Sequence, residues 1–107
     1  MSVVLFVRVK SKLPVDELER RVLERKPRFL EIPGLIQKIY GRDPSTGDVC
    51  GIYFFENRQA LAAFRETELA QTIADAYEAT EVRREVYEVL FPLRPDVGPF
   101  QDSGGSE

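Results

Sequence analysis

The sequence predicts an α+β domain in which four antiparallel strands form one sheet and two helices cover one of its faces. Three observations predict this fold. Four runs rich in β-branched and aromatic residues begin near positions 3, 34, 49 and 82. Segments with an apolar residue every three or four positions separate the first run from the second, and the third from the fourth. A short polar stretch full of turn formers, residues 42–48, joins the second run to the third as a hairpin.

Length and composition indicate an ordinary folded domain. The 107 residues suit one domain, and an apolar share of 43% is enough to build its core. We expect residues 1–93 to form the domain and residues 94–107 to be an extended or disordered tail, because the tail is rich in proline and glycine. A net charge of -3 disfavours nucleic-acid binding, and no apolar run approaches the roughly 18 residues of a membrane helix.

Cysteine and histidine usage limits the chemistry. Cys50 is the only cysteine, so no intrachain disulfide can form, which fits a reducing cytoplasm. The chain has no histidine, which removes the usual general base, the activating partner of a nucleophilic cysteine, and the commonest zinc and haem ligand. We therefore expect a cytoplasmic protein without a metal site, and we interpret Cys50 as a small buried thiol rather than a nucleophile.

The first half of the chain predicts a strand followed by a helix. Val3–Lys10 alternates as a strand, and it lacks the basic start and cleavage site of a signal peptide. A helix follows over residues 13–29, where Pro14 fits the first turn. Pro27 predicts that this helix ends or kinks near Lys26, because an interior proline removes a hydrogen bond and clashes one turn back.

The second half predicts the hairpin, a second helical region and a last strand. The hairpin strands cover residues 34–40 and 49–55. Asn57 is a good N-cap for a helix that runs to about Glu66, and Thr67 can cap a further segment. The last strand is expected over residues 82–91.

This order of elements matches the split βαβ, or ferredoxin-like, plan βαββαβ. The hairpin strands look apolar on both faces, with Leu35, Ile39 and Phe55 expected on one face and Ile36, Ile52 and Phe54 on the other. A sheet with one solvated face should alternate more cleanly. We therefore expect the face that the helices leave uncovered to pair with a second copy of the chain in a homodimer.

Several segments resemble the YdhR-type monooxygenase family of the dimeric α+β barrel superfamily, which also contains antibiotic-biosynthesis monooxygenases. The segments that carry the resemblance are Pro33–Tyr40, Gly51–Asn57 and Ala60–Phe64, within a likeness that spans roughly residues 3 to 93. The resemblance implies a homodimer whose two sheets form a shared barrel, with a pocket between sheet and helices in each subunit. Some relatives oxygenate aromatic polyketides without metal or flavin, so the resemblance implies no cofactor. Cys50 and Phe55 depart from the glycine and tryptophan that the family often has at these positions.

Three polar side chains are candidate catalytic residues. Tyr53 lies beside Gly51, whose missing side chain could leave room for a ligand, and its phenol could bind a substrate oxygen or relay a proton. Lys38 and Tyr40 share a strand face, where the lysine could lower the pKa of the tyrosine or anchor an anionic substrate. The alternatives are a core tyrosine at position 53 and a lysine at the rim of the sheet.

Five residues are candidates for the substrate-binding wall, either as space beside the ligand or as aromatic and apolar surface: Gly51, Phe29, Phe55, Phe64 and Tyr77. The aromatic residues among them can equally be plain core. The leading hypothesis is a cofactor-independent monooxygenase on a small aromatic or polyketide-like substrate, and whether the protein is an enzyme at all is left open. The alternative is a non-catalytic module of the same fold that binds a small molecule or serves assembly, and a third possibility is an isomerase or decarboxylase.

Overall fold

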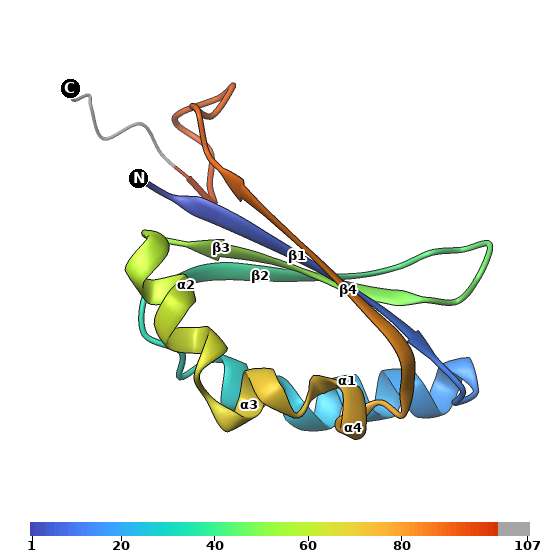
Figure 1. Ribbon diagram of the computed structural model, residues 1–107. Helices are drawn as coiled ribbons and strands as arrows, with labels where there is room; N and C mark the ends of the chain where they lie inside the picture. Colours follow the sequence, from blue (N-terminus) through green and yellow to red (C-terminus); the bar gives the residue numbers. More distant parts are fainter. Residues whose placement is uncertain (101–107) are drawn as a thin grey trace.

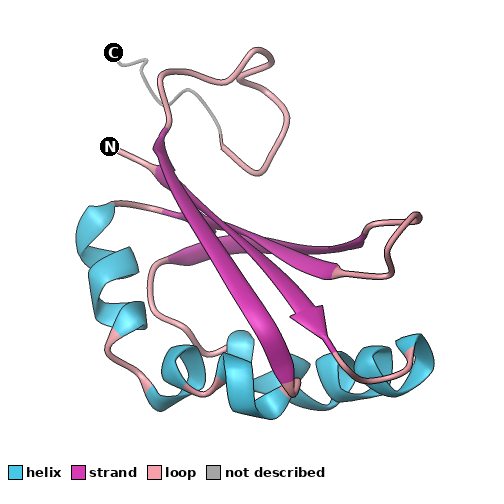
Figure 2. Ribbon diagram, turned by 45° about the vertical axis from the view of Figure 1, so that its right-hand side comes forward, coloured by secondary structure: helices cyan, strands magenta, loops and turns pink. Residues whose placement is uncertain are grey.

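The computed structural model describes residues 1–100 and has the predicted order of strands and helices (Figure 1). The sheet is antiparallel with strand order β2-β3-β1-β4, and all helices lie on one of its faces (Figure 2). The elements are β1 (Val3–Ser11), α1 (Val15–Phe29), β2 (Leu35–Arg42), β3 (Val49–Phe55), α2 (Arg58–Arg65), α3 (Glu68–Gln71), α4 (Ile73–Ala76) and β4 (Ala79–Glu88). The ferredoxin-like prediction is confirmed, while residues 101–107 of the expected tail lie outside the described residues.

Two predicted boundaries are wrong. The expected end of helix α1 near Lys26 is wrong, since the helix continues through Pro27 to Phe29 and the amide of Leu30 then bonds the carbonyl of Pro27 in a tighter i to i+3 pattern. The alternative, a kink near Lys26, stays a prediction. Strand β4 begins and ends three residues before the expected 82–91. Its early start follows from its pairing with β1, which reaches Ala79 opposite Ser11.

Both predicted helix caps are confirmed. The Asn57 side chain accepts a hydrogen bond from the amide of Ala60 at 2.8 Å, and the Thr67 hydroxyl accepts one from the amide of Ala70 at 3.2 Å. These bonds satisfy amides that have no partner within the first turn of a helix. Capping therefore accounts for Asn57 without a catalytic role.

The buried core lies between the sheet and the helices. Every second residue of β1 and β3 is buried there, and the two strands are paired so that Val3 faces Phe55 and Leu5 faces Tyr53. Burying one side chain of this size contributes roughly 1.5–3 kcal/mol. The helices add these buried residues: Leu18, Phe29, Leu61, Phe64, Leu69, Ala70 and Ile73.

A bulge in β2 changes which side chains face the helices. Leu35 pairs with Phe55 and Gln37 pairs with Phe54, so Ile36 is an extra residue without a partner on β3. The expectation that Leu35 and Ile39 share a face is therefore wrong, since one extra residue inverts the alternation after it. As a result, Leu35, Lys38 and Tyr40 all face the helices.

The other sheet face is covered by no helix of residues 1–100 (Figures 1 and 2). It carries a group of partly buried or exposed apolar residues that we call the open face: Val4, Phe6, Ile39, Ile52, Phe54 and Tyr87. The chain between β4 and residue 100 forms no helix or strand, and Phe100 at its end packs edge-on against Phe54 with ring centroids 5.2 Å apart. The division into a domain and a tail at residue 93 stays a prediction.

Gly34 marks the closest approach of the turn before β2 to helix α2. A Cβ atom built on Gly34 would lie 2.5 Å from the Cβ atom of Ala60, and the residue has a φ of +78°. Gly47, in the hairpin turn, has a similar φ of +80° but a looser contact of 3.1 Å to Val15. Both glycines therefore have a left-handed backbone, but only Gly34 also lacks the space for a Cβ atom.

We predict that Gly34→Ala destabilises the protein more than Gly47→Ala. Both variants carry the left-handed strain, about 1–2 kcal/mol for a residue with a Cβ atom, but only Gly34→Ala forces two methyl groups into collision. Urea unfolding measures both losses, and adding Ala60→Gly to Gly34→Ala should recover the difference. Equal losses in the two single variants would contradict a role for the Ala60 contact.

Candidate functional site

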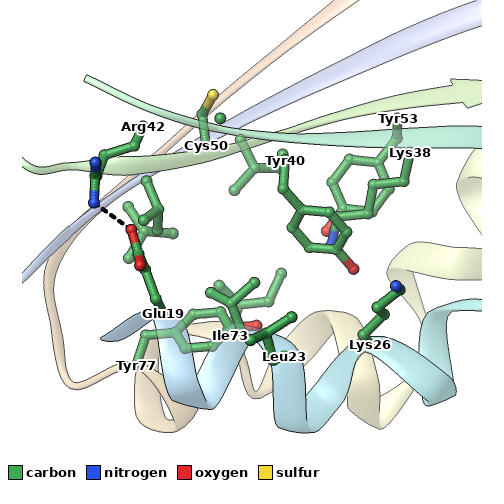
Figure 3. A pocket seen from close by; sticks show the side chains of 16 residues that line it. Glu19, Leu23, Lys26, Lys38, Tyr40, Arg42, Cys50, Tyr53, Ile73 and Tyr77 are labelled. Carbon is green, nitrogen blue, oxygen red and sulfur yellow. Dashed lines mark hydrogen bonds and ion pairs between the residues drawn. The ribbon is translucent and has the colours of Figure 1, made fainter. Parts of the chain in front are cut away.

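A cavity of about 440 Å³ opens between the helix-facing side of the sheet and helix α1 (Figure 3). Its volume lies within the range of about 300–1,000 Å³ that is usual for small-molecule sites. Most of its wall is apolar or aromatic. The residues that line it are Val7, Val9, Glu19, Val22, Leu23, Lys26, Lys38, Tyr40, Gly41, Arg42, Val49, Cys50, Gly51, Tyr53, Ile73 and Tyr77.

The structure brings together all three candidate catalytic residues. Lys38, Tyr40 and Tyr53 line the cavity, and so do the candidate wall residues Gly51 and Tyr77. The side chain of Cys50 points to the other side of the sheet, away from the cavity (Figure 3). Phe29, Phe55 and Phe64 do not line the cavity, so their contact with a substrate stays a prediction.

These three phenylalanines instead fill the space beside the cavity. Tyr53 stacks on Phe55 with centroids 6.1 Å apart and lies 5.3 Å from the ring of Phe64. Phe29 closes the group at 6.0 Å from Tyr53 and 6.4 Å from Phe64. Aromatic packing of this kind adds about 0.5–1.5 kcal/mol per pair beyond burial. The helix–sheet space is thus filled at one end and open at the other, with Tyr53 at the boundary.

The Lys38 amine lies among aromatic rings. Its Nζ is 3.3 Å from the ring centroid of Phe29, 4.3 Å from that of Tyr40 and 4.4 Å from that of Tyr53. Among residues 1–100 it forms no ion pair. A lysine at the sheet rim would keep its amine in water, so the side chain does not behave as the rim lysine that was the alternative.

Gly51 makes room for Lys38. A Cβ atom on Gly51 would lie 2.9 Å from Lys38 Cε and 3.1 Å from Tyr53 Cε1. The lysine chain therefore crosses β3 at the one point where β3 has no side chain. The space that the sequence assigned to a ligand is used by Lys38, whose position depends on this glycine.

Burial and a neighbouring positive charge lower the pKa of the Lys38 amine. Desolvation, followed by the charge of Arg25, lowers the pKa of the Lys38 amine from 10.5 to about 7. Arg25 is fixed by a 2.8 Å hydrogen bond to the carbonyl of Leu69, and its guanidinium lies 5.4 Å from the ring centroid of Tyr77. The aromatic rings favour the ammonium form and act against this shift. At neutral pH a substantial fraction of the amine is therefore uncharged.

The phenols of the cavity are weaker acids than free tyrosine. Burial raises the pKa of Tyr40 to about 12 and raises the pKa of Tyr53 further. Burial also raises the pKa of Tyr77. The expectation that Lys38 lowers the pKa of neighbouring Tyr40 is wrong, because desolvation raises this pKa and the charge that acts to lower it comes from Arg25. These phenols stay protonated at neutral pH and can donate hydrogen bonds.

The cavity mouth carries charged groups from α1 and β2. Arg42 forms an ion pair with Glu19 across the mouth, and Lys26 of α1 also lines the cavity (Figure 3). Sequence reasoning missed this mouth, because ion pairs between distant segments leave no local pattern. It also missed Arg25, although a signal existed: Arg25 breaks the apolar rhythm of α1 and therefore places a cation against the core.

Within residues 1–100 no group of three or more cysteine, aspartate and glutamate side chains is placed to hold a metal ion. No helix in that range is long and apolar enough to cross a bilayer.

Comparisons with known proteins place the chain among oxygenase-like folds. The model of the family described as "Putative mono-oxygenase ydhR" matches residues 4–94. No curated protein matches the sequence.

Solved structures with the same fold include SnoaB, a cofactor-independent oxygenase from Streptomyces nogalater. It is 14% identical with a TM-score of 0.71, over 86% of this chain and 96% of SnoaB. A putative antibiotic biosynthesis monooxygenase from Deinococcus radiodurans is 14% identical with a TM-score of 0.71, over 88% of this chain and 97% of the Deinococcus chain. Another putative antibiotic biosynthesis monooxygenase, from Nitrosomonas europaea, is 16% identical with a TM-score of 0.70, over 85% of this chain and 92% of the Nitrosomonas chain. At these identities the likeness shows the fold alone.

We predict that Lys38→Met is more stable than the wild type at pH 6 and that its advantage shrinks as the pH rises. The folded wild type releases the lysine proton at about pH 7, whereas the unfolded chain holds it up to the ordinary 10.5. The unfolded state thus binds more protons between these values, so wild-type stability rises with pH across that window, by an amount on the order of a few kcal/mol.

Urea unfolding of both proteins from pH 6 to pH 10 measures this difference. Lys12→Met, which changes an exposed lysine, is the matched control and should show no such trend. A constant difference between Lys38→Met and the wild type would contradict the shifted pKa.

Proposed function

The chain belongs to the family described as putative mono-oxygenase ydhR, and from this membership we propose that it is a cofactor-independent monooxygenase acting on a small aromatic or polyketide-like substrate. One observation carries the proposal: an apolar cavity of substrate size contains the amine of Lys38, without an ionic partner among residues 1–100 and with a pKa of about 7. A general base is most effective when its pKa is near the working pH.

The cavity supports binding of a flat, electron-rich molecule. Its wall is aromatic and aliphatic, which favours a ring system, and Tyr40 and Tyr53 supply protonated phenols for a substrate oxygen. Because their pKa values are raised, these phenols serve as hydrogen-bond donors rather than bases. Among the three candidate catalytic residues, the base is therefore Lys38.

The reaction follows from these roles. Lys38 takes a proton from an acidic methylene group, such as the one flanked by two rings in an anthrone, and leaves a carbanion that the phenols stabilise through its oxygen. The carbanion reduces dioxygen and forms a carbon–oxygen bond, which gives a hydroperoxide after protonation. Loss of water breaks the oxygen–oxygen bond and leaves a ketone. One oxygen atom enters the product, the other leaves as water, and the substrate supplies both electron pairs.

We predict oxygen uptake with hydroxylated anthrone-like compounds, with kcat/KM rising through a midpoint near pH 7 as Lys38 loses its proton. Lys38→Met should lower kcat by about a hundredfold or more, the range of a lost general base. Tyr53→Phe should lower it less, because it removes one hydrogen-bond donor. An oxygen electrode measures all three proteins, and Lys12→Met is the control. No uptake across a broad aromatic panel would contradict the proposal.

The second candidate is a non-catalytic binding module of the same fold. It is favoured by the position of the Lys38 amine against the ring of Phe29 at 3.3 Å, which suits a side chain that helps to pack the core. Binding of an aromatic dye without oxygen uptake, unaffected by Lys38→Met, would move the assignment to this candidate.

The fold family is typically dimeric, and we propose that two copies of this chain pair through the open face. Ile39 and Tyr87 are 46% and 55% exposed there, on the same face as Phe6 and Phe54. An apolar sheet surface of this kind usually meets another protein surface. A second copy is the simplest partner, because two-fold homodimers are the commonest assemblies.

We predict a dimer at micromolar concentration and a monomer for Phe54→Glu, because a carboxylate cannot be buried unpaired in an apolar interface. Sedimentation velocity measures the state of both proteins. Glu66→Gln changes an exposed charge on the opposite side of the molecule and should leave the dimer intact. A wild-type monomer would contradict the proposal.

A further inference from the structure

The Lys38 side chain is built into the cavity in a way that suits a second chemistry. We propose that its amine is also a nucleophile that forms an imine with small aldehydes and ketones, preferably ones that carry an aromatic ring, in a reaction that needs no oxygen. The proposal uses the same cavity as the monooxygenase reaction but does not depend on that function.

The amine is held in the cavity by the backbone. The bulge at Ile36 turns Lys38 toward the helices, and Gly51 lets the lysine chain cross β3. The rings of Phe29, Tyr40 and Tyr53 then surround Nζ at 3.3–4.4 Å from their centroids. A carbonyl compound that fills the cavity therefore meets an amine whose position is already fixed, which lowers the entropic cost of reaction.

Among residues 1–100 no carboxylate forms an ion pair with the Lys38 amine. Arg25 and Lys26 on α1 are cationic, while Tyr40, Tyr53 and Tyr77 are phenols. Within the part of the chain that the structure describes, the cavity wall has one carboxylate, Glu19, and it is paired with Arg42 at the mouth. A desolvated lysine near another cation is a recognised form of activated amine, because the uncharged form is the nucleophile. Burial and Arg25 lower the pKa of Lys38 to about 7, in agreement with this geometry.

The step balances without an oxidant or reductant. The lone pair of the neutral amine attacks the carbonyl carbon, a carbon–nitrogen bond forms, and the carbonyl π electrons move to oxygen. The oxygen takes up a proton to give a carbinolamine, for which the protonated phenols of Tyr40 and Tyr53 are the nearest donors in the wall. One amine hydrogen returns to the phenol that gave its proton, and the oxygen then leaves as water with the other amine hydrogen, so that the imine remains and the net loss is one water. Such an imine acidifies neighbouring carbon–hydrogen bonds, so it would support proton exchange or decarboxylation of β-keto acids.

The test is reductive trapping in the absence of oxygen. The full chain is incubated near pH 7 with benzaldehyde and cyanoborohydride, and peptide mass mapping locates the added benzyl group. We expect Lys38 to be labelled at least about tenfold faster than the exposed Lys10 and Lys12, because far more of its amine is uncharged at this pH. Its labelling rate should level off above pH 7. Labelling of Lys38 no faster than Lys12 would overturn the proposal.

Two variants sharpen the result. Lys38→Arg keeps the positive charge but removes the nucleophile, so the fast labelling should vanish, whereas Lys12→Arg should leave it unchanged. Gly51→Ala should slow the labelling of Lys38 toward the rate of Lys12, because the new methyl group would lie 2.9 Å from Lys38 Cε. If Lys38→Arg does not fold, the comparison of Lys38 with Lys12 in the wild type still decides.

The two activities can fail separately. Benzaldehyde has no methylene group to oxidise, and trapping is measured without oxygen, so oxygen uptake has no part in its outcome. Fast trapping without oxygen uptake would support the imine proposal and contradict the monooxygenase proposal. Oxygen uptake without fast trapping would support the monooxygenase proposal and contradict the imine proposal.

Discussion

The pairing of β2 with β3 is the constraint on which the site depends. Ile36 has no partner on β3, and this single extra residue turns Lys38 and Tyr40 toward the helices. Their strand partners are Tyr53 and Gly51, and the Lys38 side chain lies over Gly51, the one position of β3 that has no side chain. Shifting the register by one residue would move every side chain of β2 to the opposite face. The bulge therefore decides whether Lys38 and Tyr40, or instead Gln37 and Ile39, face the space between the sheet and the helices.

The space between the sheet and the helices is divided by Tyr53. On one side its ring packs with those of Phe29, Phe55 and Phe64, which makes the core dense. On the other side the cavity remains, and Arg25 lies close enough to influence its charges. The packed side holds the walls of the cavity in place. The desolvation that this packing causes lowers the pKa of the Lys38 amine and raises the pKa of the tyrosine phenols. The lysine becomes easier to deprotonate, while the tyrosines become harder.

The two faces of the sheet serve different purposes. The helix-facing side provides the core and the cavity, whereas the open face has apolar residues with no helix over them. The short chain after β4 contacts this face at Phe54 through Phe100. Both faces have to be apolar for this arrangement, which explains why the hairpin strands lack the clean alternation of a sheet with one solvated side.

The sequence by itself determined the order of elements, the antiparallel sheet, both helix caps and the family, because periodicity, turn residues and capping side chains act over a few neighbouring positions. It also picked out Lys38, Tyr40 and Tyr53 as a group. Only the tertiary structure decided that Gly51 makes room for Lys38 and that Arg25 adds its charge to the site. Contacts of this kind join strands and helices far apart in the chain, and a pKa shift depends on the burial that results from all of them together. The burial of the site residues therefore cannot be predicted from a local pattern in the sequence.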